Sequence, residues 1–249
     1  MEIVIGFLIA AAIGLTGVGA GVITTPVLIV FFHISPTQAV GTALIFSTIV
    51  KLVGAPVYLI RKQVHWRTLL LLISGGLPGV FTGSVLLGGL RSEHSDSLLY
   101  LLLGVTIIVF AWLNLYKLIA KSEQDGLRDR SGWLPLIALP IGAETGFSAA
   151  GAGAIGSIAL LRLTALSAGQ IIGTDMFFGL SMSSVGGGIQ LTAGHYVPAL
   201  LWKLVIGGVP GVLAGANTSA LLPSRPLRVC LSFWIIGLGA QLFWRGLSI

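Results

Sequence analysis

The chain has 249 residues, of which 55% are hydrophobic and 9% are charged, and its formal net charge is +6. Soluble domains carry roughly 25% charged residues, so this composition excludes an ordinary soluble protein. The Lys and Arg residues lie between apolar stretches of about 20 residues rather than in one basic stripe, which excludes nucleic acid as a partner and predicts an all-α polytopic membrane protein with the lipid bilayer as its surroundings.

Apolar runs and the residues that interrupt them predict eight membrane segments in chain order. The longest polar linker, residues 121–132, divides the chain into a first transmembrane repeat (1–120) and a second one (133–249). The predicted segments are 3–32, 36–60, 66–90, 97–119, 133–163, 166–192, 196–222 and 226–247.

The two halves repeat each other at an offset of 132 residues. "SPTQAVGT" (35–42) aligns with "SAGQIIGT" (167–174), and "GGLPGVFTG" (75–83) aligns with "GGVPGVLAG" (207–215), sharing six of nine positions. Chance similarity between apolar segments does not keep one offset over such a distance. We therefore expect two homologous halves of four segments each.

The charges of equivalent loops indicate how the halves are oriented. Loop 61–67 carries three Lys or Arg residues, whereas its counterpart 193–199 carries none. Because cytoplasmic loops are enriched in Lys and Arg, we expect inverted repeats and a cytoplasmic linker 121–132. An inverted repeat needs an odd number of crossings per half, so one of the four segments is expected to be broken or re-entrant. The glycine-rich first segment of each half is the best candidate.

The stretch "GLTGVGAGVITTP" (14–26) lacks the third glycine and the acidic residue of a dinucleotide-binding fingerprint. Its glycines have two interpretations: close helix packing of the GxxxG kind, or a helix break whose free N–H groups bind an anion. Thr24, Thr25 and Ser157 are suited to satisfy backbone groups that such breaks release. The candidate substrate-binding residues at the two glycine clusters are Gly17, Gly19, Gly21, Thr24, Gly151 and Gly153.

A polar stripe follows each glycine cluster. Ser35, Gln38 and Thr42 share one helical face, and the second half repeats this trio. Such a stripe faces a partner helix or a cavity, so it serves either as interhelical hydrogen bonding or as part of a shared substrate site. The candidate substrate-binding residues here are Gln38, Thr42, Gln170 and Thr174.

Lys51 and Asp175 lie about halfway along otherwise apolar segments. Charges within a membrane are costly and are usually paired or functional, so two alternatives stand: an ion pair, or Lys51 binding an anionic substrate while Asp175 carries a coupling ion. Glu144 is a second coupling candidate. The four His residues lie at segment ends and Cys230 is the single cysteine, so we expect no metal, no cofactor and no catalytic residues, and hence no enzyme.

Taken together, the glycine-rich "GLTGVGAGVITTPVL", "QAVGTALIFSTIVKLVGAPVYLIRKQVHWR" and "GGLPGVFTG", with "GQIIGTD" and "GGVPGVLAG" in the second half, resemble the TauE/SafE sulfite exporter family, also called TSUP transporters. The resemblance implies a bacterial cytoplasmic-membrane carrier that exports a small sulfur-containing anion, such as sulfite or an organosulfonate, by alternating access and with proton coupling as one option. The alternatives are an anion channel, a carrier of small carboxylates, or a non-transporting membrane subunit. A homo-oligomer is a further candidate assembly.

Overall fold

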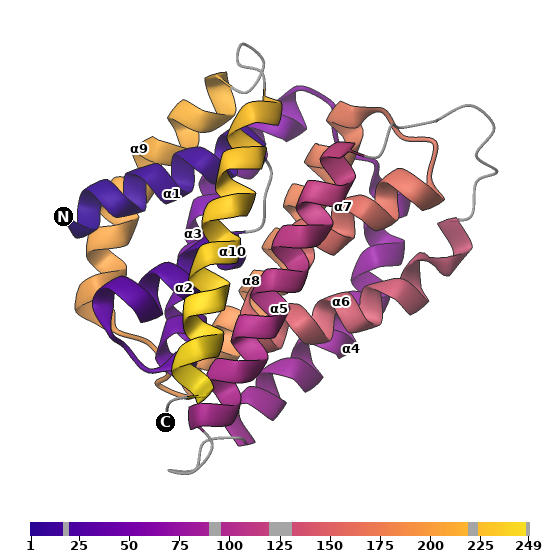
Figure 1. Cartoon of the computed structure of the whole chain (residues 1–249). Coiled ribbons are helices and arrows are strands. Elements are labelled where there is room, and N and C mark those ends of the chain that lie inside the picture. Colours follow the sequence, from indigo (N-terminus) through magenta and orange to yellow (C-terminus); the bar gives the residue numbers. More distant parts are fainter. Residues whose placement is uncertain (17–19, 90–95, 120–130, 219–223, 248–249) are drawn as a thin grey trace.

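The computed structural model describes residues 1–16, 20–89, 96–119, 131–218 and 224–247. The described residues form helices joined by short connections, with no strand among them (Figure 1). This confirms the all-α prediction. The helices of the described part are α1 (Glu2–Thr16), α2 (Ala20–Phe32), α3 (Pro36–Ile60), α4 (Trp66–Gly89), α5 (Asp96–Ile119), η1 (Ser131–Trp133), α6 (Leu134–Ser148), α7 (Gly151–Leu163), α8 (Ala168–Thr192), α9 (Pro198–Thr218) and α10 (Ser224–Leu247).

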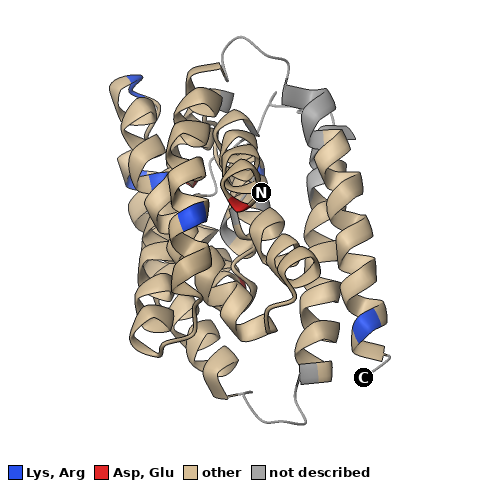
Figure 2. Ribbon diagram, turned by 90° about the vertical axis from the view of Figure 1, so that its left-hand side faces the viewer, with Lys and Arg blue, Asp and Glu red and all other residues tan. Residues whose placement is uncertain are grey.

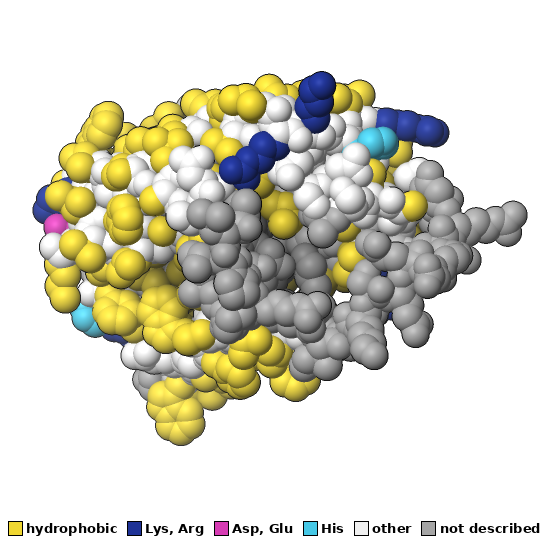
Figure 3. All heavy atoms as spheres, turned by 90° about the horizontal axis from the view of Figure 1, so that it is seen from above, with side chains coloured by type: hydrophobic (Ala, Val, Ile, Leu, Met, Phe, Trp, Pro, Cys, Tyr) yellow, Lys and Arg dark blue, Asp and Glu magenta, His cyan; other side chains and the backbone are white. Residues whose placement is uncertain are grey.

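The helix surfaces suit a bilayer. Within the described residues, four helical stretches are long and apolar enough to cross a membrane: α3, α4, α9 and the Val229–Leu247 part of α10. Large side chains such as Leu70, Leu136 and Trp202 point outward and are more than half exposed. Charged residues are few on the described helices (Figure 2). Seen from above, hydrophobic side chains cover much of the described surface, and several Lys and Arg side chains and a His lie toward one edge (Figure 3). The polytopic membrane architecture is thus confirmed.

The first predicted segment of each half forms two helices instead of one. In the second half, α6 ends at Ser148 and α7 begins at Gly151. Ala149 between them has a φ of 66°, and this left-handed conformation cannot continue a right-handed helix. In the first half, α1 ends at Thr16 and α2 begins at Ala20, while Gly17 and Gly19 lie outside the described residues.

Helices pair across the halves in a pattern that recurs at the 132-residue offset. α1 packs along α9, and α4 packs along α6. Both pairs need glycine: a Cβ on Gly79 would lie 2.1 Å from the Leu139 carbonyl oxygen, and one on Gly211 would lie 2.4 Å from that of Phe7. The "GGLPG" and "GGVPG" motifs therefore let backbones approach closely. α5 and α10 also lie side by side (Figure 1).

α3 and α8, the equivalent helices of the two halves, pack against each other in antiparallel orientation. The backbone N–H of Val197, which follows α8, donates to Thr42 Oγ1 near the start of α3 at 3.1 Å. The N–H of His65, which follows α3, donates to Thr174 Oγ1 near the start of α8 at 3.0 Å. Each helix therefore begins where the other ends.

The α6–α7 unit returns to the end of the molecule from which it starts. Ser131, just before α6, and Thr164, just after α7, line one cavity together with His65 at the start of α4. We call this unit the α6–α7 hairpin. The α1–α2 hairpin is placed in the same way, because Glu2 forms an ion pair of 3.1 Å with Lys203 of α9, and α3, which follows α2, also begins beside α9.

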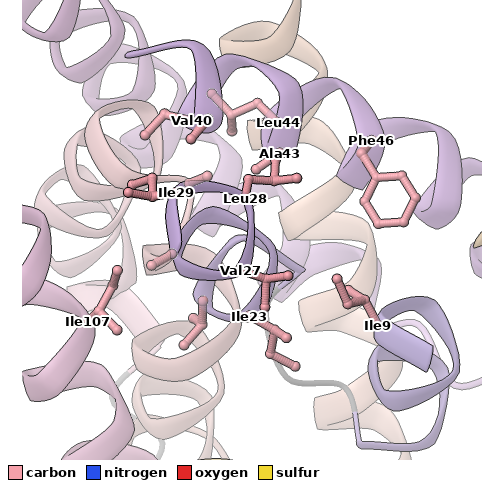
Figure 4. Close-up of a cluster of buried hydrophobic side chains, with 14 of the residues drawn as sticks. Ile9, Ile23, Val27, Leu28, Ile29, Val40, Ala43, Leu44, Phe46 and Ile107 are labelled. Carbon is pink, nitrogen blue, oxygen red and sulfur yellow. The ribbon is translucent and has the colours of Figure 1, made fainter. Parts of the chain in front are cut away.

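A core of buried hydrophobic side chains joins the α1–α2 hairpin to α3 and α5 (Figure 4). Apolar packing of this kind fixes the position of the α1–α2 hairpin inside the bundle, because a close-packed interior resists displacement. Its members include Ile9, Ile23, Val27, Leu28, Ile29, Val40, Ala43, Leu44, Phe46 and Ile107.

Candidate functional site

The break between α6 and α7 is held by side chains of its own chain. The Ser148 hydroxyl oxygen accepts from the Ala150 N–H at 3.2 Å, and the hydroxyl donates to the Glu144 carboxylate. Gly151 and Gly153 lie buried in the first turn of α7. The first N–H groups of any helix lack partners within the helix and carry a partial positive charge, so this turn presents donors that suit an anion.

The α1–α2 hairpin contacts this break directly. Thr25 of α2 donates its hydroxyl to the Ser148 carbonyl at 3.2 Å. A Cβ on Gly21 would lie 1.9 Å from the Ala149 carbonyl oxygen, so only glycine allows this approach. The start of α2 and the break between α6 and α7 therefore meet inside the bundle.

Two carbonyl groups where helices end accept from hydroxyl donors. Tyr58 of α3 donates to the Gly14 carbonyl in the last turn of α1 at 3.1 Å, and Thr25 donates to the Ser148 carbonyl at the end of α6. The expectation for Thr25 agrees with this contact, whereas Ser157 donates to the Gly153 carbonyl at 2.7 Å, four residues earlier within α7. Thr24 is fully buried beside Thr25 on α2.

Lys51 and Asp175 are buried and interact electrostatically. Asp175 lies against α7, because a Cβ on Gly156 would come within 2.5 Å of its Oδ1 atom. Gly156 is five residues beyond Gly151, about 7.5 Å along the helix. Asp175 is thereby placed beside α7, little more than one turn from the break, and Lys51 interacts with it from α3.

The structure places the polar stripes of α3 and α8 apart, toward opposite ends of the helix pair. Because the two helices are antiparallel, Thr42 and Thr174 lie at opposite ends of the pair, where each accepts a backbone N–H. Gln38 is exposed, and Gln170 forms a capping box with Ser167 at the start of α8. The hydrogen bonds of Thr42 and Thr174 hold connections between helices, and those of Ser167 and Gln170 cap the start of α8.

We expect the variant Thr42→Val to be less stable but unchanged in anion affinity. It removes the acceptor of the Val197 N–H while keeping the side-chain shape, which costs about 1 kcal/mol or more. Thermal unfolding of the purified protein should shift to lower temperature, with the KM of transport unaltered. Thr42→Ser, which keeps the hydroxyl, should restore the melting temperature. A raised KM in Thr42→Val alone would return this residue to the substrate site.

Two residues at the site escaped the sequence reasoning. Ser148 links the Glu144 carboxylate to the start of α7, and Tyr58 binds the end of α1. The spacing of Glu144 and Ser148, four residues on one helix, was a usable signal, because such pairs face each other. Tyr58 carried no pattern that distinguished it from an interfacial tyrosine.

Comparison with known proteins assigns the chain to a family of membrane transporters. A family model described as "Sulfite exporter TauE/SafE" matches residues 2–242. The chain is 29% identical to the "Probable membrane transporter protein YjnA" of Bacillus subtilis (strain 168), over 96% of this chain and 98% of that one. It is 28% identical to the "Probable membrane transporter protein YdhB" of the same organism, over 91% and 92% of the two chains. No solved structure matches.

Proposed function

Because the chain belongs to the sulfite exporter TauE/SafE family, we propose that this membrane transporter is a secondary carrier of a small sulfur-containing oxyanion, sulfite or an organosulfonate. The family and the relatives indicate a membrane transporter. The anion, its export across a bacterial inner membrane and the alternating-access mechanism are our proposal.

The observation that carries the proposal is the meeting of the two hairpins inside the bundle. Thr25 and Gly21 of one hairpin touch Ser148 and Ala149 of the other. Interrupted helices that meet at depth present backbone N–H groups to an anion in many secondary transporters. A site formed by both halves also changes its access when one half moves against the other.

The residues around the break would have different roles according to their charge. Gly151 and Gly153 would offer backbone N–H groups at the start of α7 to the anion, with Gly21 and Thr24 of α2 beside them. Lys51 would neutralise part of its charge. Glu144 and Asp175 are the carboxylates for a coupling proton: Glu144 touches the Ser148 hydroxyl that caps α7, and Asp175 interacts with Lys51. Protonation of either carboxylate would favour anion entry by removing a negative charge.

The antiparallel packing of α3 and α8 supports inverted repeats, because equivalent helices that cross a membrane in opposite directions place the two halves upside down relative to each other. We expect single cysteines at Val64 and Tyr196, introduced with Cys230→Ser, to react with a membrane-impermeant maleimide from opposite sides. Position 64, in the basic loop, should react from the cytoplasmic side. Labelling of both cysteines from one side would contradict the inverted arrangement.

Flux into proteoliposomes tests the function. We expect sulfite or a small organosulfonate to accumulate, in preference to sulfate and small carboxylates, when a pH gradient is imposed. Flux that follows only the gradient of the anion itself, with electrical conductance, would identify a channel. Preferential accumulation of small carboxylates would show that the substrate is a carboxylate and not a sulfur-containing oxyanion. Absence of flux for every anion would leave a non-transporting subunit and refute the proposal.

A further inference from the structure

A polar cavity lies at the outer end of the α6–α7 hairpin. Its volume is about 200 Å³, and it opens where the start of α4, the first residue of η1 and the connection after α7 meet. Thr164 is thirteen residues beyond Gly151, which places this cavity about 20 Å along α7 from the break. The residues that line it are His65, Arg67, Thr68, Ser131, Thr164, Ala165 and Leu166.

The lining is rich in hydrogen-bond donors. Arg67 contributes a cationic guanidinium with several N–H donors in one plane. His65 Nδ1 accepts from the Thr68 N–H at 3.4 Å and lies 2.7 Å from Thr68 Oγ1. In the neutral ring the proton is therefore on Nε2, which is left to donate. No Asp or Glu is among the described residues that line the cavity, so its charge is positive.

The other half of the chain provides an internal comparison. The matching hydrogen bonds of His65 to Thr174 and of Val197 to Thr42 fix the register between the halves at 132 residues. In that register Arg67 and Thr68 correspond to Ala199 and Leu200. The same junction is thus built with apolar residues in one half, which means that helix packing does not require the polar set.

We propose that this cavity is a second anion site, which binds a small oxyanion such as sulfate or phosphate, either free or as the phosphate group of an anionic lipid. Arg67 provides paired donors that match two oxygens of such an ion, and His65 and Thr68 lie beside it. Since both ends of the α6–α7 hairpin line the cavity, a bound anion would connect them to the start of α4. The proposal stands on the cavity and is independent of which anion crosses the membrane.

The test uses the full chain in phosphatidylcholine nanodiscs and equilibrium dialysis with inorganic sulfate and with phosphate. We expect Arg67→Gln to weaken binding of at least one of them about tenfold or more, since a charge-assisted hydrogen bond is lost. Lys62→Gln is the matched control, because Lys62 is an exposed cation of the same connection outside the cavity lining. An equal loss in both variants would indicate general charge attraction and overturn the proposal.

Nanodiscs that also contain phosphatidylglycerol distinguish the two sources of the anion. Arg67-dependent retention of phosphatidylglycerol, without binding of the inorganic ions, would assign the site to a lipid headgroup. Absence of Arg67-dependent binding of sulfate, phosphate and phosphatidylglycerol alike would refute the site. Lys51→Gln should leave Arg67-dependent binding intact, so failure of the transport proposal and failure of this one are separate results.

Discussion

Replacing Lys51 by Gln is expected to lower the affinity of the protein for the transported anion by about 10- to 100-fold, as measured by the KM of flux into proteoliposomes. Lys51 is buried on α3 and interacts with Asp175, which lies against α7 close to the break. Charge-assisted hydrogen bonds contribute roughly 1.5 to 3 kcal/mol, which corresponds to this loss of affinity. Lys51→Arg, which keeps the charge, should retain part of the affinity.

A control is needed because removing one partner of a buried charge pair also destabilises a protein. The double variant Lys51→Gln, Asp175→Asn removes both charges and should recover folded yield without recovering anion affinity. Lys62→Gln should behave as the unchanged protein, since Lys62 is exposed between α3 and α4. Transport by the double variant with ordinary affinity would show that Lys51 serves only to balance Asp175.

The variant Gly21→Ala is expected to reduce transport about tenfold or more. The added methyl group would lie 1.9 Å from the Ala149 carbonyl oxygen and 2.5 Å from the Ala149 Cβ atom, so the two hairpins must separate. Separation would also strain the hydrogen bond from Thr25 to the Ser148 carbonyl. Overpacking in a dense interior costs roughly 1 to 3 kcal/mol. Flux and thermal unfolding, measured on the same preparation, check the result.

Gly188→Ala is the matched control for this substitution. Gly188 is an exposed glycine of α8 around which a Cβ would meet nothing within 4 Å, so the change adds the same methyl group without a clash. It should leave flux unchanged and stability equal or slightly raised, because alanine favours a helix over glycine. Ordinary flux in a folded Gly21→Ala protein would show that contact between the hairpins is not needed for transport.

Much of the fold could be read from periodicity and breakers. Long apolar runs predicted helices that begin at Pro36 and Trp66, where α3 and α4 begin, and one from residue 196, close to the start of α9 at Pro198. A single membrane segment satisfies its backbone groups only as a helix. The repeat offset predicted an interruption in the first segment of each half, and the structure shows it at Ala149 in the second half. The role of the polar stripes could not be read, since hydroxyls such as those of Thr42 and Thr174 serve a substrate or a backbone N–H equally well.

The sequence by itself determined a helical membrane protein and predicted an interruption in the glycine-rich first segment of each half, because composition, hydropathy and spacing are properties of the chain alone. Only the tertiary structure decided which polar groups belong together. The antiparallel packing of α3 and α8 separates Thr42 from Thr174, while the two hairpins bring Thr25 to Ser148 across 123 residues of chain. Such contacts depend on how the helices pack in space, and no local pattern in the sequence predicts that packing.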